Sequence, residues 1–224
     1  MSARHLKTIG CLNTGAPLRS GKPDEAEILA MDPLYRGYFG ATRYTLRHQT
    51  FAGGWSPVIT REVFERGHAV AVLPYDPVRD EVVLIEQFRA GALAAGWNPW
   101  LIEVPAGMIE PGEAPDAVAR RETAEEIGLE VGRLDFVAHI LCTPGGSSET
   151  LAVYCGEVST EMVCDHGGLA DEHEDIRVFA MSADEAVALL DRGALDNAST
   201  VLVVQWFALN RAKLRARWLA PKEG

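Results

Sequence analysis

The sequence predicts an α/β protein, an α/β/α sandwich preceded by a small N-terminal antiparallel β module. Near-continuous apolar runs at residues 68–73 and 82–88 are typical of central strands that are covered on both faces. An acidic helix is expected at residues 114–127, between strand-rich halves of the chain. A further helix after residue 182 covers the opposite face of the sheet and completes the two helical layers.

The N-terminal part differs from the rest of the chain. The first thirty or so residues are polar and irregular, and glycines and prolines interrupt any period. Alternating patterns at residues 35–50 and 57–64 then predict a short antiparallel sheet. We therefore divide the chain into a β module at residues 1–65 and a larger domain at residues 66–224. A module this small needs a surface to pack on, which predicts a homodimer.

The remaining elements follow from apolar runs and helix signals. Further strands are expected at residues 100–104, 136–142, 150–155 and 176–181. Ser182 and Glu185 form a capping box at the start of a helix that Gly193 ends. The last helix runs from about Asn197 to Leu219, and we assign its broad apolar surface to the core.

Composition limits the classes of function. A chain of 224 residues with a net charge of −11 is a poor candidate for non-specific nucleic-acid binding, which depends on clustered Lys and Arg. The four cysteines form no CxxC pair and read as reduced thiols. No secretory signal and no apolar run of membrane-spanning length is present, so that a cytoplasmic location without membrane contact is expected.

The most informative segment lies between Gly107 and Leu129. Its fixed positions are Gly107, Glu113, Arg121, Glu122, Glu125, Glu126, Gly128 and Leu129. Pro115 suits the first turn of a helix and Gly128 suits the left-handed position that ends one, which predicts the helix at residues 114–127. At about 100° per residue, three of the glutamates point the same way.

These three carboxylates, on Glu122, Glu125 and Glu126, repel one another unless a divalent cation offsets their charge. All-oxygen ligands favour hard ions such as Mg²⁺ or Mn²⁺ over zinc. A solvated acidic face would explain two glutamates alone, but not the glycine, the arginine and Glu113 that accompany them. 

The other side of the helix carries Ala117, Ala124 and Ile127, which are expected to pack on the sheet. Arg121 lies beside the acidic arc, where it would orient the carboxylates.

The spacing Gly-x5-Glu-x7-Arg-Glu-x-x-Glu-Glu-x-Gly-Leu resembles the Nudix box, and the chain resembles a Nudix hydrolase over nearly its whole length. Thr123 occupies a position that is usually hydrophobic. The resemblance implies a sandwich with a mixed sheet. Features outside the box are similar to one branch of the family, the ADP-ribose diphosphatases. They are Pro144 and the segments 34–39, 143–149 and 168–177.

The resemblance implies a role for each matched position. Glu122, Glu126 and Glu174, with the backbone carbonyl of Ala106, would hold Mg²⁺, with Mn²⁺ as the alternative. Glu172 would be the general base, although other carboxylates of the same acidic loop leave that choice open.

The same resemblance implies the remaining site residues. Glu125 and Arg121 would complete the catalytic group. The substrate-binding residues would be Tyr38, from the partner subunit of a dimer, and Arg61, Arg89 and Glu149.

The implied reaction is Mg²⁺-dependent hydrolysis of the diphosphate bond of ADP-ribose, a small nucleotide sugar, to AMP and ribose 5-phosphate. Three alternatives stay open. The first is a Nudix hydrolase that acts on another sugar nucleotide such as GDP-mannose. The second is a ligand-sensing module without turnover, and the third is a protein that binds a partner through its C-terminal helix. The last alternative explains none of the box residues.

Overall fold

The computed structural model describes residues 23–169 and 174–220. The described residues form two compact units, which comprise residues 23–36 with 41–63, and residues 37–40 with those from 64 onward. The predicted division into domains at residue 65 stays a prediction, because a compact unit need not fold independently. No helix in the described part of the chain is long and apolar enough to cross a membrane.

The smaller sheet has the strand order β1-β2-β3. Its strands are β1 (Ala26–Arg36), β2 (Gly40–His48) and β3 (Ile59–Glu65), and the short helix η1 (Pro23–Glu25) precedes them. Ion pairs join Arg47 of β2 to Glu27 at 2.7 Å and Arg43 of β2 to Glu62 at 3.2 Å. These pairs connect the middle strand to both neighbours.

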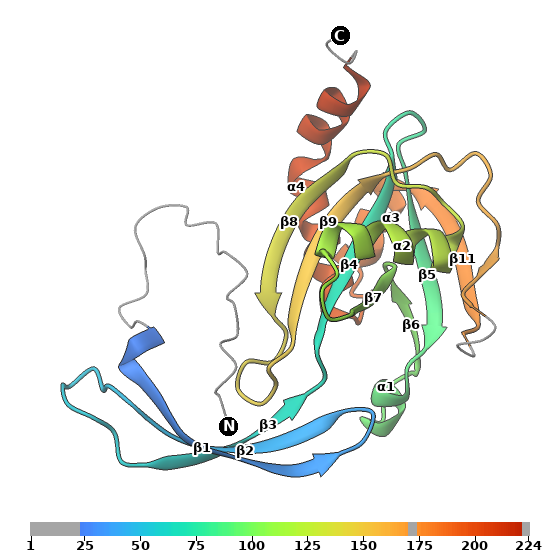
Figure 1. The fold of residues 1–224 in the computed structure, drawn as a ribbon. Coiled ribbons are helices and arrows are strands. Elements are labelled where there is room, and N and C mark those ends of the chain that lie inside the picture. The colour runs from blue at the N-terminus through green and yellow to red at the C-terminus, as the bar shows by residue number, and fades with distance from the viewer. Residues whose placement is uncertain (1–22, 170–173, 221–224) are drawn as a thin grey trace. The chain divides into compact units, whose positions relative to one another are not determined.

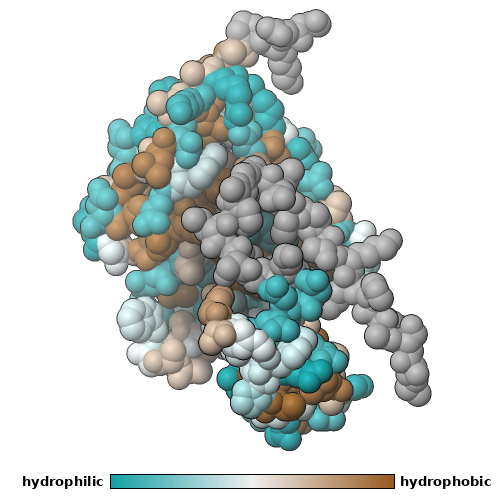
Figure 2. Space-filling model, turned by 90° about the vertical axis from the view of Figure 1, so that its left-hand side faces the viewer, coloured by the Kyte–Doolittle hydropathy of each residue, from teal (hydrophilic) through white to brown (hydrophobic). Residues whose placement is uncertain are grey.

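The sequence-based prediction for this region was wrong at β1, which begins within the stretch expected to be irregular. All of β1 is exposed, so no buried face imposes a period of two on its side chains. Its large apolar residues Ile28, Leu29, Met31, Leu34 and Tyr35 are between 42% and 64% exposed. Figure 2 shows that one face of the molecule carries brown, hydrophobic residues beside teal, hydrophilic ones.

The larger unit is built on a mixed sheet with the order β10-β11-β5-β4-β9-β8, in which β6 also pairs with β5 and β7 with β4. Its strands are β4 (His68–Asp76), β5 (Glu81–Phe88), β6 (Trp100–Glu103), β7 (Ala106–Ile109), β8 (Leu134–Leu141), β9 (Thr150–Glu157), β10 (His166–Gly167) and β11 (Ile176–Ser182). The central strands β4 and β9 run parallel, and the neighbouring pairs are antiparallel. The sequence did not predict β7 and β10, which are short.

Helices cover both faces of this sheet (Figure 1). The covering helices are α2 (Pro115–Ile127) on one face and α3 (Ala183–Asp191) with α4 (Ala198–Leu219) on the other. The short helix α1 (Ala90–Ala94) follows β5 and buries none of its residues. Alternate residues of β4 show the layers: Val70 and Val72 pack with Val118 of α2, whereas Leu73 belongs to the core that includes Phe207 of α4. The α/β/α sandwich predicted from the sequence is confirmed.

Helix α2 ends at Gly128, whose φ of 71° confirms the left-handed position, but the helix is rotated relative to the prediction. Ile127 is buried as expected, whereas Ala117 and Ala124 are exposed. Val118 and Glu126 are buried instead. Glu126 therefore faces into the protein, whereas the Glu125 side chain is 33% exposed.

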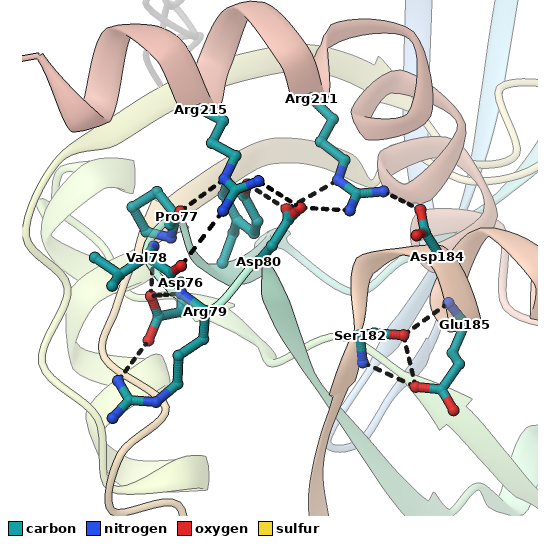
Figure 3. A network of polar contacts seen from close by, with 11 residues as sticks. Asp76, Pro77, Val78, Arg79, Asp80, Ser182, Asp184, Glu185, Arg211 and Arg215 are labelled. Atoms are coloured by element: carbon teal, nitrogen blue, oxygen red, sulfur yellow. Dashed lines mark hydrogen bonds and ion pairs between the residues drawn. The ribbon is translucent and has the colours of Figure 1, made fainter.

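An ion-pair network attaches α4 to the β4–β5 turn (Figure 3). The carboxylate of Asp80 accepts hydrogen bonds from Tyr75 at 2.7 Å, from Arg211 at 2.6 and 2.9 Å and from Arg215 at 2.9 Å. The hydrogen bond from Arg211 is the largest cause that lowers the pKa of Asp80, and Tyr75 and Arg215 act in the same direction. Arg215 also donates to the carbonyl of Pro77 at 2.8 Å.

We predict that Asp80→Asn lowers the free energy of unfolding at pH 7 by about 2 kcal/mol, since it removes the charge that two arginines share. Asparagine tolerates the φ of 61° at this position, so backbone strain does not contribute. Because the folded pKa is lowered, the carboxylate stabilises the protein above its unfolded pKa, and this contribution is lost as pH falls through the folded pKa. In urea unfolding, the free energies of Asp80→Asn and wild type should differ at pH 7 and become equal at low pH. The control Asp191→Asn, at an exposed residue, should match wild type at both pH values.

Candidate active site

The floor of the site is formed where β7 passes α2. Gly107 pairs with Val70 of β4, and its backbone lies directly against the side chain of Glu122. A Cβ atom at residue 107 would lie 1.9 Å from Cδ and Oε1 of Glu122. The first glycine of the motif is therefore needed for close approach, which places a carboxylate of α2 on the backbone of β7.

Glu126 is the most deeply buried carboxylate of this group, with 3% of its surface exposed. Its Oε2 accepts a hydrogen bond from the backbone N–H of Ala106 at 3.1 Å. Burial raises its pKa to about 8, the charges of Glu174 and Glu122 add to the rise, and Arg89 opposes it. The structure therefore brings these predicted residues within electrostatic reach of one another.

Two glycines allow close packing in the segment before β11, the first against α2 and the second against Glu174. A Cβ atom on Gly167 would lie 1.8 Å from the carbonyl oxygen of Glu126, and one on Gly168 would lie 2.8 Å from Cβ of Glu174. Glu174 accepts a hydrogen bond from the backbone N–H of Leu169 at 3.3 Å. Glu172, the predicted base, lies outside the described residues, and its role stays a prediction.

Arg121 binds the outer carboxylates of the box. Its guanidinium lies 2.9 Å from Glu122, 2.8 Å from Glu125 and 3.4 Å from Glu113. Glu113 also accepts a hydrogen bond from the backbone N–H of Glu110 at 2.9 Å. Arg121 thus links the loop before α2 to the helix and offsets part of the acidic charge, as an orienting residue would.

Arg89 follows β5 and approaches the cluster from the sheet. Its Nε donates to Oε2 of Glu103 at 2.8 Å, and Glu103 is 2% exposed. No motif in the sequence indicated a role for Glu103. The available signal was one acidic residue at the end of the apolar segment 100–104.

The other predicted substrate residues are distributed over both units. Arg61 lies in the smaller unit, where its side chain donates to the carbonyl of Thr60. In the larger unit, Tyr38 is 91% exposed and contacts the ring of Phe39 edge-on at 4.8 Å between centroids. Their substrate contacts stay predictions.

Glu149 has a cationic partner, Arg66, that is not among the predicted site residues. Arg66 lies 3.4 Å from Glu149, and its guanidinium covers the ring of Phe39 at 5.4 Å. These contacts, with the edge contact of Phe39, connect Glu149 to the neighbourhood of Tyr38.

The donor set fits a hard divalent cation. No three acidic, histidine or cysteine side chains in the described part of the chain are placed to enclose a metal ion. The predicted set, however, includes the carbonyl of Ala106, and Mg²⁺ usually retains several waters. Burial is the main cause that raises the pKa of Glu126, the charges of Glu174 and Glu122 add to it, and a cation bound here would favour the ionised carboxylate. The ligand assignment stays a prediction.

We predict that Glu126 makes the metal-free protein less stable as pH rises. Its folded pKa of about 8 lies above the ordinary value of 4.5, so the native state holds the proton more tightly than the unfolded state. The stabilisation is therefore complete below the unfolded pKa and is lost as pH rises through the folded pKa. In EDTA, the free energy of unfolding of wild type, measured in urea and compared with that of Glu126→Gln, should fall by at most about 4 kcal/mol between pH 5 and 8.5. A difference independent of pH would contradict the prediction.

Comparisons with known proteins agree with this geometry. The NUDIX domain model matches residues 65–222. The chain is 48% identical over 202 residues to the ADP-ribose pyrophosphatase of Escherichia coli (strain K12), which covers 90% of this chain and 96% of the relative. It is 41% identical over 197 residues to the ADP-ribose pyrophosphatase of Haemophilus influenzae, with 87% and 91% covered.

Two more distant proteins match as well. The GDP-mannose pyrophosphatase of Cronobacter sakazakii is 36% identical over 151 residues, with 66% of this chain and 78% of the relative covered. A crystal structure described as an ADP compounds hydrolase has a TM-score of 0.61 at 21% identity, covers 85% of this chain and 98% of its own, and supports the fold. Because the matched domain model includes the whole larger sheet and the helix that carries the glutamates, the chain belongs to the NUDIX family.

Proposed function

We propose that this protein hydrolyses the diphosphate bond of ADP-ribose and releases AMP and ribose 5-phosphate. The observation that carries the reaction class is the buried carboxylate of Glu126, whose pKa is raised by burial and by two neighbouring glutamates. The identity of 41–48% with ADP-ribose pyrophosphatases over most of the chain supports the substrate. The chain is thus a nucleoside-diphosphate-sugar hydrolase of the NUDIX family.

The carboxylates and Arg89 would act on the charge of the diphosphate. Glu122, Glu126 and Glu174, with the carbonyl of Ala106, would hold Mg²⁺, or Mn²⁺ in its place. When bound, the cation neutralises diphosphate charge and lowers the pKa of the attacking water. Arg89 directs a guanidinium toward the same charge, which suits phosphate recognition.

The proton of the attacking water needs a base, and we assign it to the acidic loop that contains Glu172. Glu125 and Arg121 keep the outer face of α2 ordered through their 2.8 Å ion pair. Arg61 and Glu149 would contact the substrate, and Tyr38 would stack on the adenine bound by a partner subunit. Water attacks one phosphorus and gives up a proton to the loop base. The bond from that phosphorus to the bridging oxygen breaks, the oxygen leaves with the other phosphate, and two phosphate monoesters result.

We further propose a homodimer in the cytoplasm. Strand β1 lies at the edge of its sheet and exposes apolar side chains, among them Ile28, Met31 and Tyr35. A second copy of the chain would cover them. The described cysteines, Cys142, Cys155 and Cys164, are free thiols, as is usual in a reducing compartment.

The activity is tested by phosphatase-coupled phosphate release in Mg²⁺ with ADP-ribose, GDP-mannose, NADH and diadenosine polyphosphates. We expect ADP-ribose to be preferred by the wild type. Glu126→Gln should lower kcat by about 100-fold or more, since it removes a charged ligand. Exposed Glu130→Gln, the matched control, should retain activity.

Other results would change the proposal in defined ways. Preference for GDP-mannose would retain the chemistry and overturn the substrate, and the relative at 36% identity makes this the second candidate. Wild-type protein that hydrolyses none of these compounds would favour a ligand-sensing module.

The dimer is tested by light scattering at micromolar concentration. We expect wild type to be dimeric and Ile28→Glu with Met31→Glu to be monomeric, because charge on β1 prevents apolar burial. Leu209→Glu, at an apolar residue that is 85% exposed on α4, should leave the dimer intact. A wild-type monomer with full activity would show that Tyr38 has no role across subunits.

A further inference from the structure

Glu103 joins the proposed phosphate-binding arginine to a helix that is distant in sequence. It ends β6, pairs with Ile85 of β5 and is 2% exposed. Its Oε2 accepts from Nε of Arg89 at 2.8 Å, and its Oε1 accepts from Nδ2 of Asn197. Both oxygens of this buried carboxylate are therefore used by protein donors.

Asn197 has two functions at once. It is the N-cap of α4, where its Oδ1 accepts from the backbone N–H groups of Ser199 at 2.9 Å and Thr200 at 3.3 Å. The opposite end of the same amide donates to Glu103. The hydroxyl of Thr200 accepts from the backbone N–H of Val104 at 3.2 Å, which attaches the first turn of α4 to the residue after Glu103. The position of Glu103 is thus fixed from two directions.

Arg89 is held in a way that leaves its terminal groups available. Among the described residues, its side chain makes one hydrogen bond, and this bond uses Nε. The side chain is 42% exposed, and its charge reaches Glu126. A guanidinium bound through Nε alone retains the N–H donors of both terminal nitrogens, which are the groups that bind phosphate oxygens.

We propose that Glu103 and Asn197 are positioning residues, which hold Arg89 so that its terminal nitrogens face the diphosphate of the substrate. This inference rests on the proposed function of the site. An unrestrained arginine loses side-chain entropy when substrate binds, whereas one that is already held loses less. The helix N-terminus also favours the negative charge of Glu103 and so supports the pair.

Asn197→Ser separates positioning from helix capping. Serine is as good an N-cap as asparagine, but its side chain is too short to cap α4 and also reach Glu103 as the amide does. We expect kcat/KM for ADP-ribose to fall about 10-fold, as for partners that orient a binding group. Ser182→Ala, which removes the cap of α3, is the control and should lower the Tm without changing kcat/KM.

A double-mutant cycle tests whether the effect passes through Arg89. In an Arg89→Ala background, Asn197→Ser should cause no further loss of kcat/KM, because the group that it positions is absent. An undiminished loss in that background, or unchanged kcat/KM in the single variant, would overturn the proposal. Glu103→Gln should act like Asn197→Ser, since an amide at residue 103 places a nitrogen against one of the two donors, Arg89 or Asn197. Circular dichroism identifies any variant that fails to fold.

A binding measurement separates this inference from the proposed function. Calorimetry with ADP-ribose in EDTA reports affinity without turnover, so it is informative even if wild type hydrolyses nothing. Wild type should bind more tightly than Asn197→Ser and Arg89→Ala, and the two losses should not add. Equal affinity of wild type and Asn197→Ser would contradict positioning, whereas binding in EDTA by a wild type that hydrolyses none of the compounds in Mg²⁺ would contradict only the proposed function.

Discussion

The burial of Glu126 is the constraint on which the site depends. A carboxylate that is 3% exposed loses most of its hydration, and one hydrogen bond from Ala106 compensates only in part. The neighbouring charges of Glu122 and Glu174 increase the cost. The sheet and its flanking segments must hold these groups together against their repulsion, and a bound cation would reverse the sign of the interaction.

Close backbone packing achieves this arrangement. Gly107 brings β7 onto Glu122, and Gly167 brings the segment before β11 onto the end of α2, in both cases at distances that leave no room for a Cβ atom. These two contacts place side chains from α2 beside the strands that carry Ala106 and lead to Glu174. The site is thus assembled by backbone approach from elements that are separate in sequence, and the arginines then supply local counter-charge.

The sequence predicted what depends on local signals and missed what depends on tertiary contacts. Proline at the start of α2 and Gly128 at its end are local, as is the capping box of α3, and their predictions were confirmed. The rotation of α2 and the short strand β7 depend on pairing partners that no local pattern encodes. Glu103 and Asn197, which are 94 positions apart, look like an isolated acid and an ordinary helix cap until the fold brings them together.

Helix α4 connects stability with the geometry of the site. Its first residues are attached to the β6–β7 region through Asn197 and Thr200, while Arg211 and Arg215 attach its later turns to Asp80. Between these ends, Phe207 and its neighbours fill the core against the central sheet. A helix fixed at both ends resists rotation and sliding, and either motion would displace Glu103 and the guanidinium that it holds. The acidic cluster on one face of the sheet and Arg89 therefore keep their relative positions partly because of a helix on the opposite face.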